Sequence, residues 1–211
     1  MIAALLADGT SDKALLPIPR WVLACASPVE SRVEWIDTAS FERPAFSLRE
    51  KVELAQIVCP CDLLFVHRDA EKQPPQRRYE EIQQAVGKRI HVAVVPIRMT
   101  EAWLLIDSGA IRAAAGRVSS LDDLDLPPFA RLETDVDPKD TLYKALKCAH
   151  GATGRRAQRF HPPTAVHRLA NLVEDWSPLR RLTAFQRLEE DTRRALSALG
   201  LTLHPAASSM P

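Results

Sequence analysis

Short apolar runs alternate with helical patterns through the first half of this chain, and this alternation constrains the fold more than any other feature. The apolar runs indicate strands at residues 2–7, 32–37, 62–67 and 90–97. Segments with apolar residues at helical spacing lie between them, at residues 11–26, 47–58 and 77–88. Such alternation is typical of a parallel sheet with right-handed crossovers and helices on both faces. We therefore predict an α/β domain over residues 1–107, with a four-stranded, mainly parallel sheet flanked by helices.

The pattern becomes helical in the second half of the chain. Helices are predicted at residues 100–116, 137–151, 164–176 and 177–200, with Ser177 as the N-cap of the last one. We expect residues 108–203 to form a helical extension packed on the α/β domain and residues 204–211 to form a disordered tail. Pro17 and Pro19 conflict with the first predicted helix, because proline removes a backbone hydrogen bond and clashes with the preceding turn. That helix should begin late or kink.

Composition narrows the classes of function. The chain has 211 residues, with 28 Lys and Arg against 27 Asp and Glu, so its net charge indicates neither a globally basic nucleic-acid binder nor an acidic tail. The apolar run at 90–97 is too short to span a bilayer, and the start of the chain lacks the basic segment of a signal peptide. We expect a cytoplasmic protein with no membrane contact. Cys59 and Cys61 could face the same way and bind zinc, but no second pair at ligand spacing accompanies them, which favours bystander thiols.

Acidic residues follow three of the four predicted strands. Asp8 and Asp12 come after the first strand, Asp69 and Glu71 after the third, and Glu101 after the fourth. The carboxyl ends of parallel strands meet at one edge of a sheet, where ligands bind. Two carboxylates about 4 Å apart repel by roughly 4 kcal/mol at an effective dielectric constant near 20, so such a cluster favours a cation. Hard oxygen ligands favour Mg²⁺ or Mn²⁺, and phosphoryl transfer is the natural chemistry of such a site.

Each of these carboxylates also has a structural interpretation. Asp8 or Asp12 could cap the next helix, and we prefer capping or phosphate-loop support for Asp12 and metal binding for Asp8. Asp69 and Glu71 could be solvated loop charges, paired with neighbouring cations. Glu101 could simply be the acidic first-turn residue of the helix that follows it.

Cationic and imidazole side chains near these segments are candidates for contact with phosphate. His67 is expected to face the same side as Asp69, because residues two apart in an extended chain share a face. Arg98 follows the fourth strand, and Lys139 opens a predicted helix. Arg155 and Arg156 belong to the basic segment 151–163, which contains no acid and suits a phosphate backbone or an acidic protein face.

Three ordered motifs carry a resemblance to a known family. The segments LLADGTSDKALL, LLFVHRDAE and VPIRMTEAWLL resemble the Toprim-like domain of a group of bacterial proteins, related to domains of topoisomerases, primases, overcoming-lysogenization-defect nucleases and phage-defence effectors. The resemblance covers residues 1–107 and, loosely, 137–142. It implies that Asp8 stands for the glutamate that ends the first Toprim strand, and that Asp69 and Glu71 form the metal-binding pair. Asp8 is one methylene shorter than that glutamate.

The resemblance implies a divalent-metal nuclease that cuts DNA or RNA, including tRNA. Catalysis would fall to Asp8, Asp69, Glu71 and Lys139, with Mg²⁺ or Mn²⁺ held by Asp8, Asp69, Glu71 and Glu101. His67, Arg98, Arg155 and Arg156 would contact phosphate. It also implies a separate ATPase of the ABC or SMC type as partner, because the sequence has no G-x-x-x-x-G-K-[ST] motif. The alternative is a non-catalytic regulatory or scaffold subunit of such an ATPase complex, and the oligomeric state stays open.

Overall fold

Four parallel strands form one sheet at the centre of the protein. The computed structural model describes residues 1–41, 47–119 and 123–205. The strand order is β2-β1-β3-β4, and each neighbouring pair is parallel. The strands are β1 Ile2–Leu6, β2 Arg32–Trp35, β3 Leu63–His67 and β4 His91–Val94. The predicted α/β fold with a four-stranded parallel sheet, flanking helices and a helical C-terminal part is confirmed.

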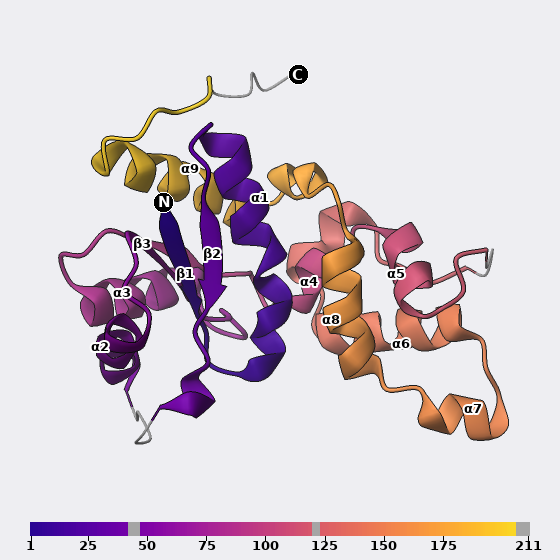
Figure 1. Cartoon of the computed structure of the whole chain (residues 1–211). Helices are drawn as coiled ribbons and strands as arrows, with labels where there is room; N and C mark the ends of the chain where they lie inside the picture. Colours follow the sequence, from indigo (N-terminus) through magenta and orange to yellow (C-terminus); the bar gives the residue numbers. More distant parts are fainter. Residues whose placement is uncertain (42–46, 120–122, 206–211) are drawn as a thin grey trace.

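Helices cover both faces of the sheet (Figure 1). On one face, α2 (Leu48–Val58) and α3 (Pro75–Val86) bury Val52 and Ile82 against the even-numbered side chains of β1 and β3. On the other face, α1 (Pro17–Ala26) and α9 (Thr183–Ala198) pack against the odd-numbered side chains, such as Phe65. The central strands are therefore apolar on both sides, which explains their continuous apolar runs.

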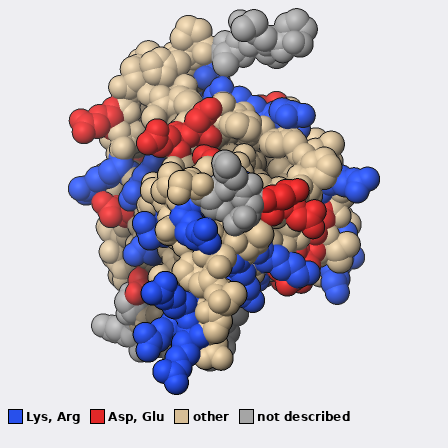
Figure 2. Space-filling model, turned by 90° about the vertical axis from the view of Figure 1, so that its right-hand side faces the viewer, with Lys and Arg blue, Asp and Glu red and all other residues tan. Residues whose placement is uncertain are grey.

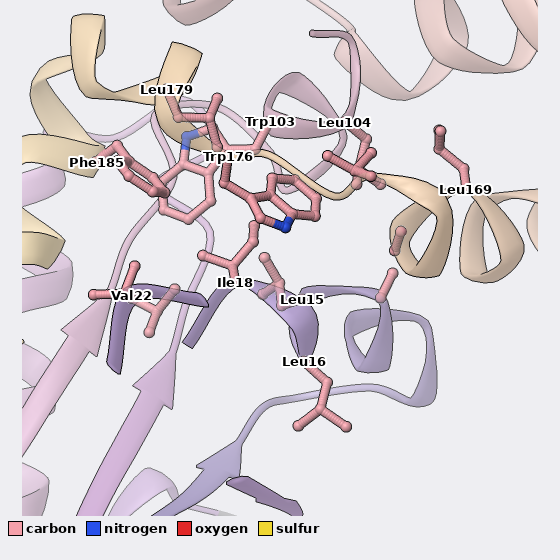
Figure 3. Close-up of a cluster of buried hydrophobic side chains, with 14 of the residues drawn as sticks. Leu15, Leu16, Ile18, Val22, Trp103, Leu104, Leu169, Trp176, Leu179 and Phe185 are labelled. Atoms are coloured by element: carbon pink, nitrogen blue, oxygen red, sulfur yellow. The ribbon is translucent and has the colours of Figure 1, made fainter. Parts of the chain in front are cut away.

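The C-terminal helices share the core of the α/β part. The remaining helices are α4 Glu101–Leu104, α5 Ser108–Ala114, α6 Pro138–His150, α7 Gly154–Arg159 and α8 Pro162–Leu172, with 3-10 helices η1 Thr10–Leu15, η2 Thr38–Ser40, η3 Phe129–Thr134 and η4 Ser177–Arg181. One continuous cluster of buried residues runs from the sheet through α1 and α4 into α6, α8 and α9. Figure 3 shows Trp103, Trp176 and Phe185 in this cluster, and the rings of Trp103 and Phe185 meet edge to face with centroids 5.6 Å apart. The extension is thus packed on the sheet.

Two of the predicted helices are each divided into two shorter helices in the structure. Residues 11–26 divide into η1 and α1, with Pro17 at the first turn of α1, as the prolines predict. Residues 100–116 divide into α4 and α5, because Asp107 accepts a hydrogen bond from the backbone of Ala110 and starts a new helix.

The start of the last helix is a correction to the prediction. Ser177 begins the 3-10 helix η4, and the α-helix α9 begins only at Thr183. The carboxylate of Glu133 accepts hydrogen bonds from the backbone of Thr183 at 3.3 Å and of Ala184 at 3.1 Å, so the cap of α9 comes from a distant segment. No local pattern around Ser177 could reveal it.

The helical part contains two further features that the sequence did not predict. The basic segment 151–163 contains the short helix α7. His204 was expected in a disordered tail, but its backbone N–H donates to the carbonyl of Ala26 at 2.8 Å. Residues 206–211 lie outside the described part of the chain. In the portion of the chain that the structure describes, none of the helices combines the length and apolar character that crossing a bilayer requires.

Candidate functional site

The loops that follow β3 and β4 are hydrogen-bonded to each other, and the candidate site is built on them. Backbone N–H groups after β3 donate to carbonyls after β4: Ala70 to Pro96 at 3.1 Å and Glu71 to Arg98 at 2.8 Å. Glu71 and Arg98 both have positive φ, 55° and 72°. This left-handed conformation is uncommon for residues with a side chain, and here it turns both loops at the carboxyl edge of the sheet.

Asp69 is held at this edge by His67 and Thr100. Thr100 Oγ1 donates to Asp69 Oδ1 at 3.3 Å, and His67 Nε2 lies 3.5 Å from the same oxygen. His67 Nδ1 lies 3.0 Å from the carbonyl oxygen of Val94, which can only accept, so Nδ1 carries a proton. The other ring nitrogen, Nε2, lies 3.3 Å from Thr100 Oγ1 as well as 3.5 Å from Asp69 Oδ1. The prediction that His67 and Asp69 share a side is confirmed.

Glu101 and Asp12 bring further negative charge to Asp69. Burial raises the pKa of Asp69 to about 6; the charge of His67 opposes this shift, whereas the charges of Asp12 and Glu101 add to it. Burial also raises the pKa of Glu101, against the effect of Lys139, whose Nζ lies 4.0 Å from Glu101 Oε1. The side chains of Asp69 and Glu101 are only 22% and 12% exposed. This group, Asp12, Asp69 and Glu101 with His67, Thr100 and Lys139, is called the carboxylate cluster below.

Asp12 closes the turn that begins η1. Its Oδ2 accepts a hydrogen bond from the backbone N–H of Gly9, the N-cap residue, at 3.1 Å. The predicted capping role is therefore confirmed. The charge of Asp12 also contributes to the raised pKa values of Asp69 and Glu101.

Asp8 lies at the same edge of the sheet but on the opposite face. Its two carboxylate oxygens contact Lys51 Nζ at 2.8 Å and Arg68 Nη1 at 2.7 Å. The expected convergence of Asp8 with Asp69 is not found, because side chains alternate between faces along a strand. Leu6 pairs with Val66 in the sheet, so two residues further on Asp8 stands beside Arg68 rather than beside Asp69.

The other predicted site residues are spread around this edge. Glu71 is 63% exposed, and its Oε2 lies 3.6 Å from Arg78 Nη2, so the structure does not bring it into the carboxylate cluster. Arg98 is half-buried, and no ion pair joins it to Asp69 or Glu101. Arg155 and Arg156 are exposed on α7, in the helical part of the protein.

No three His, Cys, Asp or Glu side chains within residues 1–41, 47–119 and 123–205 are grouped so that they could hold a metal ion. Mg²⁺ is commonly bound by one or two carboxylates, with water and phosphate oxygens completing its shell. Asp69 and Glu101, whose side chains are largely buried, are the candidates for such ligands. Burial raises the pKa of the Cys59 and Cys61 thiols, for Cys61 to about 11.

Sequence reasoning gave no site role to Thr100 or Lys51, and it did not expect Arg68 to pair with Asp8. The alternation of faces carries a signal for Arg68, because Asp8 and Arg68 are both two residues beyond a paired position. The same count separates Asp8 from Asp69. Thr100 gives no comparable signal, because its contact with Asp69 depends on the tight turn at Arg98.

Comparison of the chain with protein-family models, with curated proteins and with solved structures finds no match. The Toprim-like resemblance therefore stays a prediction. The chemical capacity of the site rests on its own geometry: two buried carboxyls, an imidazole that faces one of them and an ammonium group beside the other.

Proposed function

We propose that the protein is a divalent-metal-dependent nucleic-acid phosphodiesterase whose site is the carboxylate cluster. The observation that supports this most directly is the burial of the Asp69 and Glu101 side chains, whose pKa values are both raised. Buried like charges raise one another's pKa and are stabilised by a bound cation. Buried carboxyls with raised pKa values are typical of functional sites.

Asp69 and Glu101 would hold Mg²⁺ or Mn²⁺, in place of the set of Asp8, Asp69, Glu71 and Glu101 expected from the sequence. The metal, when bound, polarises a phosphate and promotes ionisation of a water molecule. His67 Nε2 is placed to take up a proton at Asp69. Lys139, 4.0 Å from Glu101, and Arg98 would offset the charge that develops on the phosphate oxygens.

The Toprim-like resemblance supplies the biological setting of this proposal. The protein would act in the cytoplasm on DNA or tRNA, together with a separate ABC or SMC-type ATPase of a bacterial defence system. The second candidate, a non-catalytic regulatory or scaffold subunit, is favoured by one observation. Asp8, the counterpart of the Toprim glutamate, is engaged by Lys51 and Arg68 on the other face of the sheet.

Two assays test the proposal: nicking of supercoiled DNA and cleavage of tRNA, each in Mg²⁺ or Mn²⁺. A parallel set of reactions contains the partner ATPase. We expect Asp69→Asn and Glu101→Gln each to lower the rate at least about tenfold, or 1.4 kcal/mol of transition-state stabilisation. Asp8→Asn should have a smaller effect, and Glu53→Gln, an exposed residue of α2, should have none. Loss of activity in Asp8→Asn alone would move the site to the other face, and the absence of turnover despite metal binding would favour the scaffold subunit.

A further inference from the structure

A second polar site lies in the helical part of the protein, where α5, α6, α7 and α8 surround a pocket of about 870 Å³. This volume is within the range of ordinary ligand pockets. Figure 2 faces this side of the molecule and shows Lys and Arg side chains gathered over its lower part. The pocket is lined by cations and aromatic rings, chiefly Arg117, Arg156, Arg159, Arg168, His150 and Phe160.

Within the described part of the chain, the four guanidinium groups of this pocket lack a partner. No hydrogen bond or ion pair there reaches the side chains of Arg117, Arg156, Arg159 or Arg168, and no Asp or Glu lines the pocket. Elsewhere in the protein arginines are commonly paired, as Arg68 is with Asp8 and Arg180 with Glu189. Four unpaired cations around one concavity repel one another, and an anion with several charges relieves that repulsion.

Local geometry fixes the wall of this pocket. Gly151 ends α6 with a φ of 58°, and a side chain there would collide with Arg117 Nη1, so glycine lets Arg117 lie across the end of the helix. His150 Nδ1 lies 2.9 Å from the carbonyl oxygen of Ala115, and the His150 ring stacks on Phe160 with centroids 4.2 Å apart. Rigid aromatic surface therefore adjoins the cations, which is the combination that single-stranded nucleic acids bind.

We propose that this pocket binds consecutive phosphates of a single-stranded nucleic acid and guides the strand toward the carboxylate cluster. Helix α6 links the two sites, with Lys139 in its first turn and His150 in its last. At 1.5 Å per residue these positions are about 16 Å apart along the helix, a distance that a short single strand can span. The step from pocket to cluster rests on the proposed phosphodiesterase, whereas the binding of the strand in the pocket does not.

Binding without a metal separates this proposal from catalysis. Fluorescence anisotropy in EDTA would follow labelled single-stranded DNA and RNA of about six nucleotides between about 50 and 200 mM salt, with pyrophosphate and AMP as competitors. Arg156→Gln is the test variant. Lys147→Gln is the matched control, because it removes the same charge from an exposed residue of α6 that does not line the pocket.

We expect Arg156→Gln to weaken binding at least fivefold and to lower the salt slope by about 0.7, the value of one phosphate contact on a single strand. Lys147→Gln should stay within twofold of the wild type, and Asp69→Asn should bind normally even where cleavage fails. Equal losses in Arg156→Gln and Lys147→Gln would show diffuse charge and overturn the pocket. Calorimetric binding of AMP or pyrophosphate where neither strand binds would overturn the nucleic-acid assignment, as would an acidic protein binding where the oligonucleotides do not.

Discussion

The charged form of Asp69 lowers the stability of the folded protein, whereas the proposed metal binding requires that charge. Its pKa is raised to about 6 from an ordinary 3.8, chiefly because burial disfavours its charged form. A carboxyl whose folded pKa exceeds its unfolded pKa binds a proton more tightly in the native state. It therefore contributes stability that is fully present below pH 4 and is lost as the pH rises through 6. At neutral pH the native protein holds a charge that its surroundings disfavour.

Asp69→Asn should therefore stabilise the metal-free protein at pH 7.5 relative to pH 4. The shift from 3.8 to about 6 corresponds to at most about 3 kcal/mol, and asparagine keeps the shape and the acceptor for Thr100 without the charge. Urea unfolding of both proteins in EDTA at the two pH values gives the difference. The exposed Glu53→Gln variant should show no such pH-dependent gain, and a constant difference between Asp69→Asn and the wild type would contradict the raised pKa.

The same substitution should weaken metal binding. If Asp69 and Glu101 hold Mg²⁺ or Mn²⁺, removing one of two charged ligands should lower the affinity for Mn²⁺ at least about tenfold, or 1.4 kcal/mol. Calorimetric titration at pH 7.5 would measure it, with Glu71→Gln as the comparison, because Glu71 lies outside the carboxylate cluster beside Arg78. Equal affinities of wild type and Asp69→Asn would return Asp69 to a structural role.

At the scale of elements, the start of α9 depends on a carboxylate from η3. Glu133 accepts two backbone hydrogen bonds at Thr183 and Ala184, where the positive end of the helix dipole lies. Glu133→Ala should destabilise the protein by about 1–2 kcal/mol, as the loss of a good cap does. Chemical denaturation would measure it, and Glu190→Ala, on an exposed position of α9, should change stability by less than about 0.5 kcal/mol.

The sequence predicts the strands of this protein better than the ends of its helices. The central strands were predictable because residues 3–7 and 63–67 are buried and form continuous apolar runs. The ends of helices were harder to predict wherever the cap is remote, as Glu133 is from Thr183. At the candidate site, Asp69, Glu101 and His67 were predictable from their place after strands. Asp8 is separated from Asp69 by the register of the sheet, and Glu71 is turned away from the carboxylate cluster by its left-handed backbone conformation. The types of these residues do not reveal either effect.

For the whole molecule, the shared core makes residues 1–107 an incomplete unit. Leu5, Phe65 and Val94 on one face of the sheet belong to the cluster that α9 and the other C-terminal helices complete. A chain of residues 1–107 would expose this face to water at a cost of about 25 cal/mol for each Å² of apolar surface. We expect it to lack a cooperative thermal transition in near-UV circular dichroism, which residues 1–205 should show. A cooperative transition in the shorter chain would establish it as an autonomous domain.

The two ends of the described chain leave from the same side of the molecule (Figure 1). The N-terminal ammonium of Met1 donates to the carbonyl of Glu30 at 2.9 Å, and His204 donates to Ala26 at 2.8 Å, so both lie near the amino ends of the strands. The carboxylate cluster lies at the opposite edge. A tether, a fluorescent label or a fused protein joined beyond His204 would therefore point away from that edge, and the protein can be immobilised on a surface with the cluster facing the solution.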